Sequence, residues 1–240
     1  MKSSTWKSLV VVASLVAGAA SGRADEGTIT GKVTLKGTPP TEKTIDMAAD
    51  SKCNALHETP ATTRHYVVNG NGTLQNVFVY VKSGPGIDGK TFEPPKTKAT
   101  LDQKGCLYYP YVFGIMVNQE LEIKNSDDTL HNVHALPTKN DEFNKGQPMK
   151  DMTFTHKFTK PEMPPIKFKC DVHPWMFAYC AVLPHPFFDT TREGGTFKIS
   201  NLPPGNYVVE AWHHKAGTQT ANVTVTAGGT ATADFTFEAK

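Results

Sequence analysis

The segment that decides the fold is the run from Ile166 to Met176, which reads IKFKCDVHPWM. Its first part alternates apolar and basic residues, a pattern that predicts a β-strand with one buried face. Its second part places Cys170, His173 and Met176 in a loop of seven residues directly after that strand. A thiolate, an imidazole and a thioether together are the ligand types of a blue-copper site. The run therefore predicts a strand followed by a metal-binding loop.

A site of this kind needs a second imidazole, and the chain supplies one upstream. Residues 125–134 read NSDDTLHNVH, a polar turn that leads into a short strand. His131 lies where the remote ligand is expected. His134 follows three residues later, so an alternating strand points it to the opposite face, away from the metal.

Residues 98–184 resemble a cupredoxin, most closely the amicyanin and plastocyanin group, through HNVH at 131–134 and CDVHPWM at 170–176. The resemblance implies one type 1 copper ion, with His131, Cys170 and His173 as equatorial ligands and Met176 as the axial ligand. It also implies that Asn132 ties the first ligand strand to the Cys loop. A copper ion held by four protein side chains has no open position for a substrate. The expected function is therefore single-electron transfer, not catalysis.

Other interpretations of the same residues stay open at this point. Cys170 can instead belong to a disulfide, with His173 as an ordinary turn residue, and Met176 can be a core residue that fills a gap. A structural zinc site would favour further Cys or His over Met. A dinuclear copper centre requires two Cys in the ligand loop, and only Cys170 is there.

The ligand loop also suggests how a redox partner binds. His173 lies at the tip of the loop and is expected at the protein surface, where its ring edge would pass electrons to a transiently docked partner. The expected apolar rim consists of Pro174, Trp175, Phe113 and Leu136. Lys139, Lys145 and Lys150, in a polar insertion over 137–151, can steer an acidic partner or simply be solvated.

The rest of the chain predicts an all-β protein. Short β-rich runs are separated by Gly, Pro, Asn and Asp, and only residues 47–56 suggest a short helix. The expected strands are 29–35, 74–82, 97–102, 111–117, 121–125, 152–158, 166–170, 196–200, 206–212, 220–226 and 231–237, with a further strand over 177–183 after the ligand loop. This number of strands favours two β-sandwiches over one.

The segment from Gly194 resembles the carboxypeptidase-regulatory, transthyretin-like β-sandwich through GGTFKISNLPPGNYVVEAW, and the opening GTITGKVTLKG resembles the first strand of the same module. We therefore expect a discontinuous sandwich built from 25–96 and 185–240. The cupredoxin Greek-key sandwich, over 97–184, would be inserted between these two pieces. Two consecutive domains are the alternative.

The N-terminus predicts an exported protein. Lys2 and Lys7 precede a twelve-residue apolar run, which is too short to span a bilayer and is typical of a cleaved signal peptide over 1–24. Its removal takes Lys2, Lys7 and Arg23 but no acid, and changes the formal charge from +2 to −1. This charge gives no sign of nucleic-acid binding. The mature protein is expected without a membrane span, in the periplasm or at the cell surface.

Three cysteines remain once Cys170 is assigned to copper. In an oxidising compartment one pair is expected, and Cys53 with Cys106 is preferred, because each lies in a loop-like stretch. Cys180 would then be a buried free thiol, although its pairing with either of the others is open. Four histidines without ligand spacing are expected in surface or turn positions: His156, His185, His213 and His214.

Two alternative functions stay open in addition to electron transfer. One is a surface or periplasmic binding or copper-storage module, in which the flanking sandwich does the work and the metal is structural or absent. The other is copper-dependent oxidation or nitrite reduction, which would need an additional catalytic metal. A visible absorption spectrum after copper addition distinguishes the carrier from the binding module.

Overall fold

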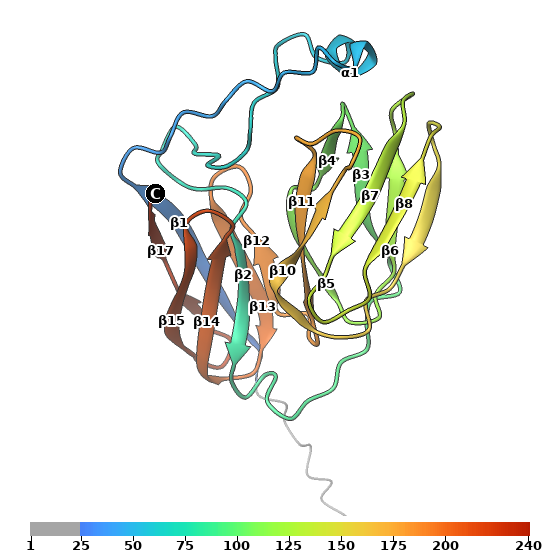
Figure 1. Cartoon of the computed structure of the whole chain (residues 1–240). Helices are drawn as coiled ribbons and strands as arrows, with labels where there is room; N and C mark the ends of the chain where they lie inside the picture. The colour runs from blue at the N-terminus through green and yellow to red at the C-terminus, as the bar shows by residue number, and fades with distance from the viewer. Residues whose placement is uncertain (1–24) are drawn as a thin grey trace, which may run out of the picture.

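The computed structural model describes residues 25–240, so the predicted signal peptide over 1–24 lies outside the described residues. Within them, the single α-helix is α1 (Ser51–Ala55), and the other regular elements are strands. Figure 1 shows these strands gathered into two bodies that lie side by side. The prediction of an all-β fold is confirmed.

The first body, here called the outer half, combines strands from both ends of the described chain. One sheet has the order β13-β1-β16, with β17 also paired to β1, and the other has the order β12-β2-β14-β15. Their bounds are β1 (Gly27–Lys36), β2 (Phe78–Ser83), β12 (Phe188–Thr190), β13 (Thr196–Leu202), β14 (Gly205–His213), β15 (Gly217–Val225), β16 (Thr230–Thr232) and β17 (Phe235–Glu238). β1 runs antiparallel to β13 and parallel to β16 and β17.

The second body, the inner half, is formed by the strands between these two pieces. Its sheets have the orders β5-β11-β10-β7-β8 and β4-β3-β6-β9. The bounds are β3 (Ala99–Lys104), β4 (Leu107–Tyr109), β5 (Val112–Met116), β6 (Leu121–Asn125), β7 (His131–Leu136), β8 (Phe143–Gln147), β9 (Thr153–His156), β10 (Glu162–Lys169) and β11 (Phe177–Leu183). The domain boundaries near 97 and 185 stay predictions.

Each half has its own buried core. Alternating residues of β1, such as Ile29 and Val33, point into the outer core, as a strand of period two requires. Ile123 of β6 and Phe168 of β10 lie in the inner core. The segment over 137–151 was expected to be a polar insertion, but it contains the strand β8. This strand pairs with β7 and therefore belongs to the sheet that carries His131.

A third apolar cluster joins the halves. Phe78 and Tyr80 of β2 pack with Tyr111, Val112 and Leu183 of the inner half. Each fully buried side chain of this size contributes about 1.5–3 kcal/mol through the hydrophobic effect. The contact is close at Gly114 of β5, where an added Cβ would lie 2.4 Å from the Phe78 ring. Glycine therefore allows this part of β5 to lie against the ring.

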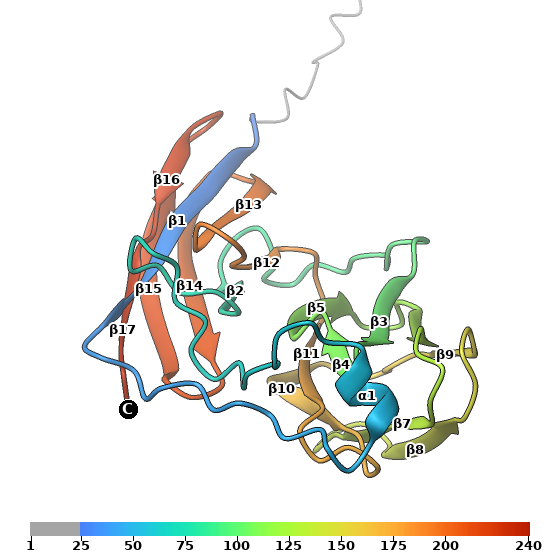
Figure 2. The ribbon, with the colours of Figure 1, turned by 90° about the horizontal axis from the view of Figure 1, so that it is seen from above.

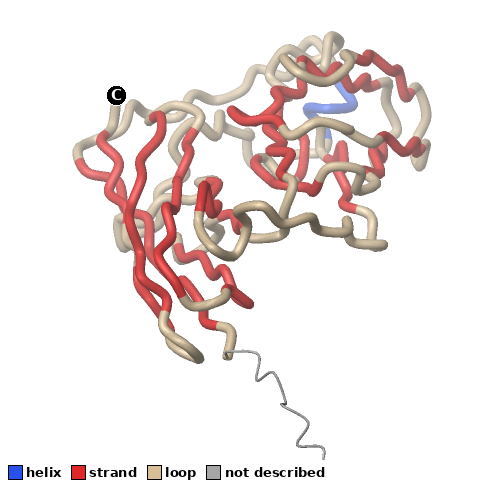
Figure 3. The backbone as a smooth tube through the Cα atoms, turned by 90° about the horizontal axis from the view of Figure 1, so that it is seen from below, coloured by secondary structure: helices blue, strands red, loops and turns tan. Residues whose placement is uncertain are grey.

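A long excursion from the outer half covers one end of the inner half. Residues 44–62, here called the cap, start and finish together, because Thr44 and Thr62 form a bridge and Ile45 N–H donates to the Ala61 carbonyl. Figures 1 and 2 show α1, at the tip of the cap, beyond the end of the inner half that holds β4. Figure 3, seen from the opposite end, shows the same helix behind the strands and loops of the inner half.

Candidate metal centre

The first predicted ligand is fixed by the turn that precedes it. Asn125, at the end of β6, donates through its side-chain amide to the carbonyls of Thr129 and Gln147, each at 2.9 Å. These bonds hold the turn so that β7 begins at His131, whose side chain is fully buried. The remote ring nitrogen, Nε2, lies 2.9 Å from Oδ2 of Asp127. The other nitrogen, Nδ1, is therefore free to face the ligand loop.

The ligand loop folds back on itself between β10 and β11. Cys170 N–H donates to the Met176 carbonyl at 3.1 Å, and Met176 N–H donates to the His173 carbonyl at 3.0 Å. These two bonds bring the ends of the loop together. Cys170, His173 and Met176 are all buried, with at most 2% of each residue exposed. Cys170 and Met176 are part of the inner core.

Asn132 joins the two ligand segments. Its Oδ1 accepts a hydrogen bond from Asp171 N–H at 2.7 Å, and the Cys170 thiol donates to the same oxygen at 3.3 Å. The role that the cupredoxin resemblance implies for Asn132 is therefore confirmed. Because Asn132 follows His131 directly, this contact sets the position of the thiol relative to the first imidazole.

Three of the four predicted ligands converge. His131 Nδ1 lies 3.0 Å from His173 Nδ1, and Cys170 Sγ lies 3.8 Å from that same nitrogen. One potential ligand atom from each of the three residues lies within 4.8 Å of the other two. Metal–imidazole bonds are about 2 Å long, so one ion can reach both nitrogens. Met176 lies at the end of the same loop, buried in the same core.

The electrostatics of the group favour a bound cation. Burial by itself would raise the pKa of the Cys170 thiol, but hydrogen bonds with His131 and His173 outweigh burial and lower that pKa to about 6. A thiolate is the form of cysteine that binds metals. A buried thiolate beside two imidazoles is a soft donor set that suits copper better than magnesium or calcium. The residues present therefore fit a copper ion.

His173 is not at the surface, and that part of the prediction is wrong. The residue is 2% exposed. Its Nε2 lies 3.0 Å from Asp50 Oδ2 and 3.5 Å from Cys53 Sγ, both in the cap. Trp175 contacts the imidazole on another side, with ring centroids 5.1 Å apart. The cap therefore covers the ring edge that was expected to meet a redox partner.

The predicted rim is also corrected in part. Phe113 is 8% exposed and packs in the inner core against Phe168, so it does not line a docking surface. Pro174 is exposed, whereas Trp175 and Leu136 are partly buried. Trp175 donates its indole N–H to the Cys106 carbonyl at 3.0 Å and so helps to hold the ligand loop under the disulfide.

The disulfide prediction is confirmed. Cys53 of α1 and Cys106, in the turn between β3 and β4, are bonded, and Cys180 is a buried free thiol. The disulfide fastens the cap to the inner half. Lys52 strengthens the same attachment, since its ammonium group donates to the Asp128 carbonyl at 2.6 Å.

Two carboxylates at the site were missed by the sequence reasoning. Asp127 accepts hydrogen bonds from Gly105 N–H and Cys106 N–H, both at 2.8 Å, in addition to its contact with His131. Its position four residues before His131, in the same turn, could have indicated that the carboxylate contacts the imidazole. Asp50 is the N-cap of α1, where its side chain accepts from Lys52 N–H and Cys53 N–H. An Asp directly before a predicted helix signals a cap, but not a contact with residue 173.

The remaining histidines divide into two groups. His134 lies away from the metal group, as predicted, and contacts Asp171 and Glu142. His185 and His213 were expected at the surface or in turns, and both are buried, with 4% and 1% exposed. His185 lies in the bend between β11 and β12, and His213 is the last residue of β14.

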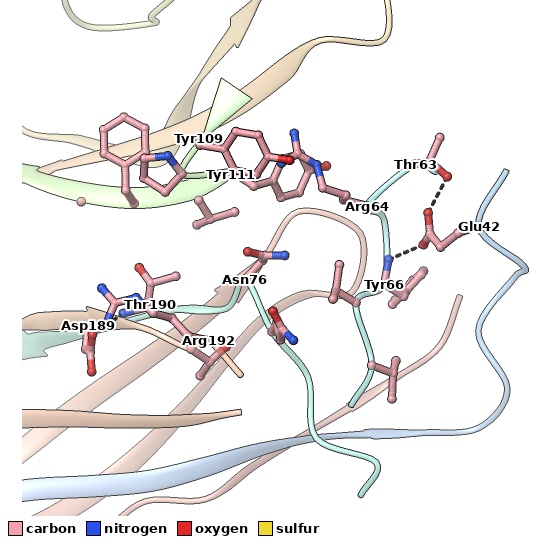
Figure 4. Close-up of a pocket in the computed structure, with 18 of the residues that line it drawn as sticks. Glu42, Thr63, Arg64, Tyr66, Asn76, Tyr109, Tyr111, Asp189, Thr190 and Arg192 are labelled. Atoms are coloured by element: carbon pink, nitrogen blue, oxygen red, sulfur yellow. Dashed lines mark hydrogen bonds between the residues drawn. The ribbon is translucent and has the colours of Figure 1, made fainter. Parts of the chain in front are cut away.

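A separate cavity of about 690 Å³ lies between the two halves. Figure 4 shows Arg64, Tyr109 and Tyr111 on one side and Asn76, Thr190 and Arg192 on the other. The Arg64 guanidinium lies over the Tyr111 ring, 4.4 Å from its centroid, and donates to the Tyr108 carbonyl at 3.1 Å. The lining contains none of the predicted metal ligands.

The comparisons with known proteins each cover only part of the chain. Residues 187–238 match the family model of the carboxypeptidase regulatory-like domain, which confirms the resemblance seen in the segment from Gly194. No curated protein matches the chain. Within the described residues, no helix has the length and apolar character needed to cross a membrane.

Several solved copper proteins show slight similarity. A copper-containing nitrite reductase from Thermus scotoductus SA-01 is 23% identical over 42% of this chain, with a TM-score of 0.34, and the match spans 25% of that enzyme. A purple cupredoxin from Nitrosopumilus maritimus is 21% identical over 35% of this chain and 98% of its own, with a TM-score of 0.30. A copper(I) form of an amicyanin mutant is 19% identical over 43% of this chain and 97% of its own, with a TM-score of 0.32. Similarity this slight carries no argument about function.

Proposed function

We propose that this chain is a type 1 copper protein that transfers single electrons between redox partners outside the cytoplasm. The observation that carries the proposal is the buried convergence of His131 Nδ1, His173 Nδ1 and Cys170 Sγ. Copper in such a set changes between two oxidation states with little rearrangement of its ligands. Met176, buried at the end of the loop, would be the weak axial ligand.

The residues of the chain perform three tasks in this function. Asn132 holds the thiol of Cys170 and the backbone of the ligand loop in place. Asp127 and Asp50 hold the remote nitrogens of the two imidazoles, so that both Nδ1 atoms face inward. The surrounding apolar core keeps water from the ligands. Four protein ligands leave no position for a substrate, which supports a carrier and not an enzyme.

The place of action and the docking surface belong to the same proposal. The Cys53–Cys106 disulfide supports an oxidising compartment such as the periplasm or the cell surface. With the His173 ring covered, we place the partner against the exposed neighbours of His173 in the ligand loop, Val172 and Pro174. Val172 is 45% exposed, an apolar side chain within two residues of the thiol ligand.

The test is a copper titration of the purified protein followed by visible absorption spectroscopy. We expect an intense blue or purple band from the thiolate–copper(II) bond in the wild type and in Cys180→Ser. The band is expected to disappear in Cys170→Ser. Cys180 is the matched control, because it is the other free cysteine and is equally buried.

A band that survives in Cys170→Ser, or a wild type that stays colourless and redox-silent with copper, would contradict the proposal. The second result would favour the binding-module interpretation, in which the outer half captures a ligand. Circular dichroism of each variant shows whether the fold is retained.

A further inference from the structure

Each of the two candidate imidazole ligands contacts a carboxylate through its Nε2 atom. Asp127 Oδ2 lies 2.9 Å from His131 Nε2, and Asp50 Oδ2 lies 3.0 Å from His173 Nε2. The two carboxylates come from different parts of the chain: Asp127 belongs to the inner half, whereas Asp50 belongs to the cap, 123 residues before His173. The second contact therefore exists only because the cap lies over the ligand loop.

The disulfide positions both carboxylates. Cys53 N–H donates to Asp50 Oδ1 at 3.2 Å, and Cys106 N–H donates to Asp127 Oδ2 at 2.8 Å. Each half-cystine thus holds the carboxylate that accepts from one imidazole. Cys53, Cys106, Asp127 and His173 are buried, and Asp50 is partly buried.

The two oxygens of Asp50 serve different purposes. Oδ1 caps α1, where it accepts from Lys52 N–H and Cys53 N–H. Oδ2 faces His173 and also accepts from Thr129 Oγ1 at 3.3 Å. Helix capping alone would be satisfied by the first oxygen. The second oxygen is directed at an imidazole whose other nitrogen faces His131 and Cys170.

A carboxylate in this position has two chemical effects on a metal-binding imidazole. It accepts the Nε2 proton, so the Nδ1 lone pair is left for the metal, and the ring orientation is fixed. Its negative charge also stabilises the more highly charged oxidation state of a nearby ion. Both effects act through His173, since Asp50 Oδ2 contacts the ring on the side opposite to Nδ1.

We infer that Asp50 of the cap is a positioning residue for the metal centre, which fixes His173 with Nδ1 toward the ion and lowers the reduction potential of the bound copper. The claim about the reduction potential rests on the proposed function, whereas the claim about the orientation of His173 does not. The metal centre is therefore composite: the inner half supplies the ligands, and the cap supplies the carboxylate that orients one of them.

The discriminating variant is Asp50→Asn, because Asn is as good a helix N-cap as Asp but carries no charge. Asp46→Asn is the matched control. Asp46 is an exposed carboxylate of the same segment, and its side chain makes a local contact, accepting from Ala48 N–H at 2.9 Å. Both variants remove one negative charge from the cap, and only one of them touches His173.

We expect the reduction potential of copper-loaded Asp50→Asn to rise, with the ratio of affinities for copper(II) and copper(I) falling roughly tenfold, which corresponds to about 59 mV for one electron. Asp46→Asn should keep the wild-type potential. Equal potentials in the two variants would overturn the claim about the potential, and so would a lowered potential in Asp50→Asn.

A second measurement needs no copper. Nitrogen-15 NMR of the metal-free protein, at a pH above the raised pKa of His173 where the ring is neutral, reports which ring nitrogen carries the proton. We expect the proton on Nε2 in the wild type and in Asp46→Asn, and a mixture of the two forms in Asp50→Ser, which keeps a capping side chain but is too short for this contact. A wild-type His173 with its proton on Nδ1 would overturn the inference. Failure of the wild type to bind copper would instead overturn the proposed function, while this measurement still tests Asp50.

Discussion

The Nδ1 atoms of His131 and His173 lie 3.0 Å apart, with the two rings inclined at 68°. His131 opens a strand of one segment and His173 lies in a loop 42 residues later, so neither local turn explains the approach. Each remote nitrogen is held by a carboxylate. Two nitrogens that face each other in this way can share one proton or bind one cation.

Loss of either imidazole should therefore have the same effect on metal binding. We expect His131→Ala and His173→Ala each to abolish the visible copper band, because the trigonal set loses a ligand in both cases. His134→Ala is the control, since His134 contacts Asp171 and Glu142 instead of the metal group. Retention of the band in His131→Ala would be incompatible with the proposed ligand set.

Asn132→Ala should loosen the ligand loop even without metal. The change removes the acceptor of Asp171 N–H and Val172 N–H and the partner of the Cys170 thiol. We expect a loss of about 1–3 kcal/mol in the free energy of unfolding, the usual cost of unsatisfied buried groups. Urea unfolding of the metal-free protein measures it. Asn144→Ala removes a contact to Asp171 and the acceptor of the Asn132 side-chain amide, but it leaves every contact of Asn132 Oδ1 in place, so it should cost clearly less.

Removal of the disulfide should destabilise the protein and free the cap. The bond closes a loop of sequence separation 53, and the chain-entropy relation gives about 4 kcal/mol for a loop of this length, within the usual range of about 2–5 kcal/mol. We expect Cys53→Ser/Cys106→Ser to lower the urea midpoint. Limited proteolysis should then cut within 44–62, where α1 has lost its covalent attachment. An uncut cap in the double variant would show that the other contacts suffice.

The buried histidines of the outer half predict an acid-sensitive fold. Burial lowers the pKa of both His185 and His213 to about 4, whereas an unfolded histidine titrates near 6.5. Between these values the unfolded chain binds protons that the folded chain does not, so stability is present above pH 6.5 and is lost as the pH falls toward 4. The slope is at most about 1.4 kcal/mol per pH unit for each imidazole.

Urea unfolding at several pH values in this window measures that slope. We expect His213→Gln to make the curve shallower than in the wild type, because one of the imidazoles whose pKa is lowered by burial is gone. A variant with the same slope as the wild type would show that His213 is protonated equally in both states.

The contact between the halves can be tested at Gly114. A side chain there would meet the Phe78 ring at 2.4 Å, and overpacking of this kind costs about 1–3 kcal/mol. We expect Gly114→Val to lower the melting temperature, and Gly146→Val, at an open position of β8, to have a much smaller effect. Equal melting temperatures of the two variants would show that the halves adjust freely.

The sequence predicted those features that depend on nearby residues. Alternation in β6 and the spacing of Cys170, His173 and Met176 are local patterns, and both the strand and the convergence of the ligand loop with His131 are found in the structure. The pairing of Cys53 with Cys106 followed from their loop-like surroundings. The resemblance of the C-terminal segment to a regulatory-like sandwich was visible in its turn residues.

The features that sequence reasoning missed depend on distant contacts. Asp50 and His173 are 123 residues apart, and no periodicity links them. His173 was expected at the surface because loop tips usually are exposed, and the cap that covers it comes from the other half of the molecule. The β8 strand was missed because its residues Asn144, Lys145 and Gly146 have low strand preference and are stabilised by pairing with β7.

The pairing of β1 with β16 and β17 has a consequence for synthesis. During translation, β1, the cap and the whole inner half leave the ribosome before the strands that pair with β1 exist. The edge of β1 that pairs with β16 and β17 therefore stays unprotected against wrong partners until residues such as Phe235, the partner of Val33, have been made. A chain cut short before residue 230 would retain every predicted metal ligand and still carry that open edge.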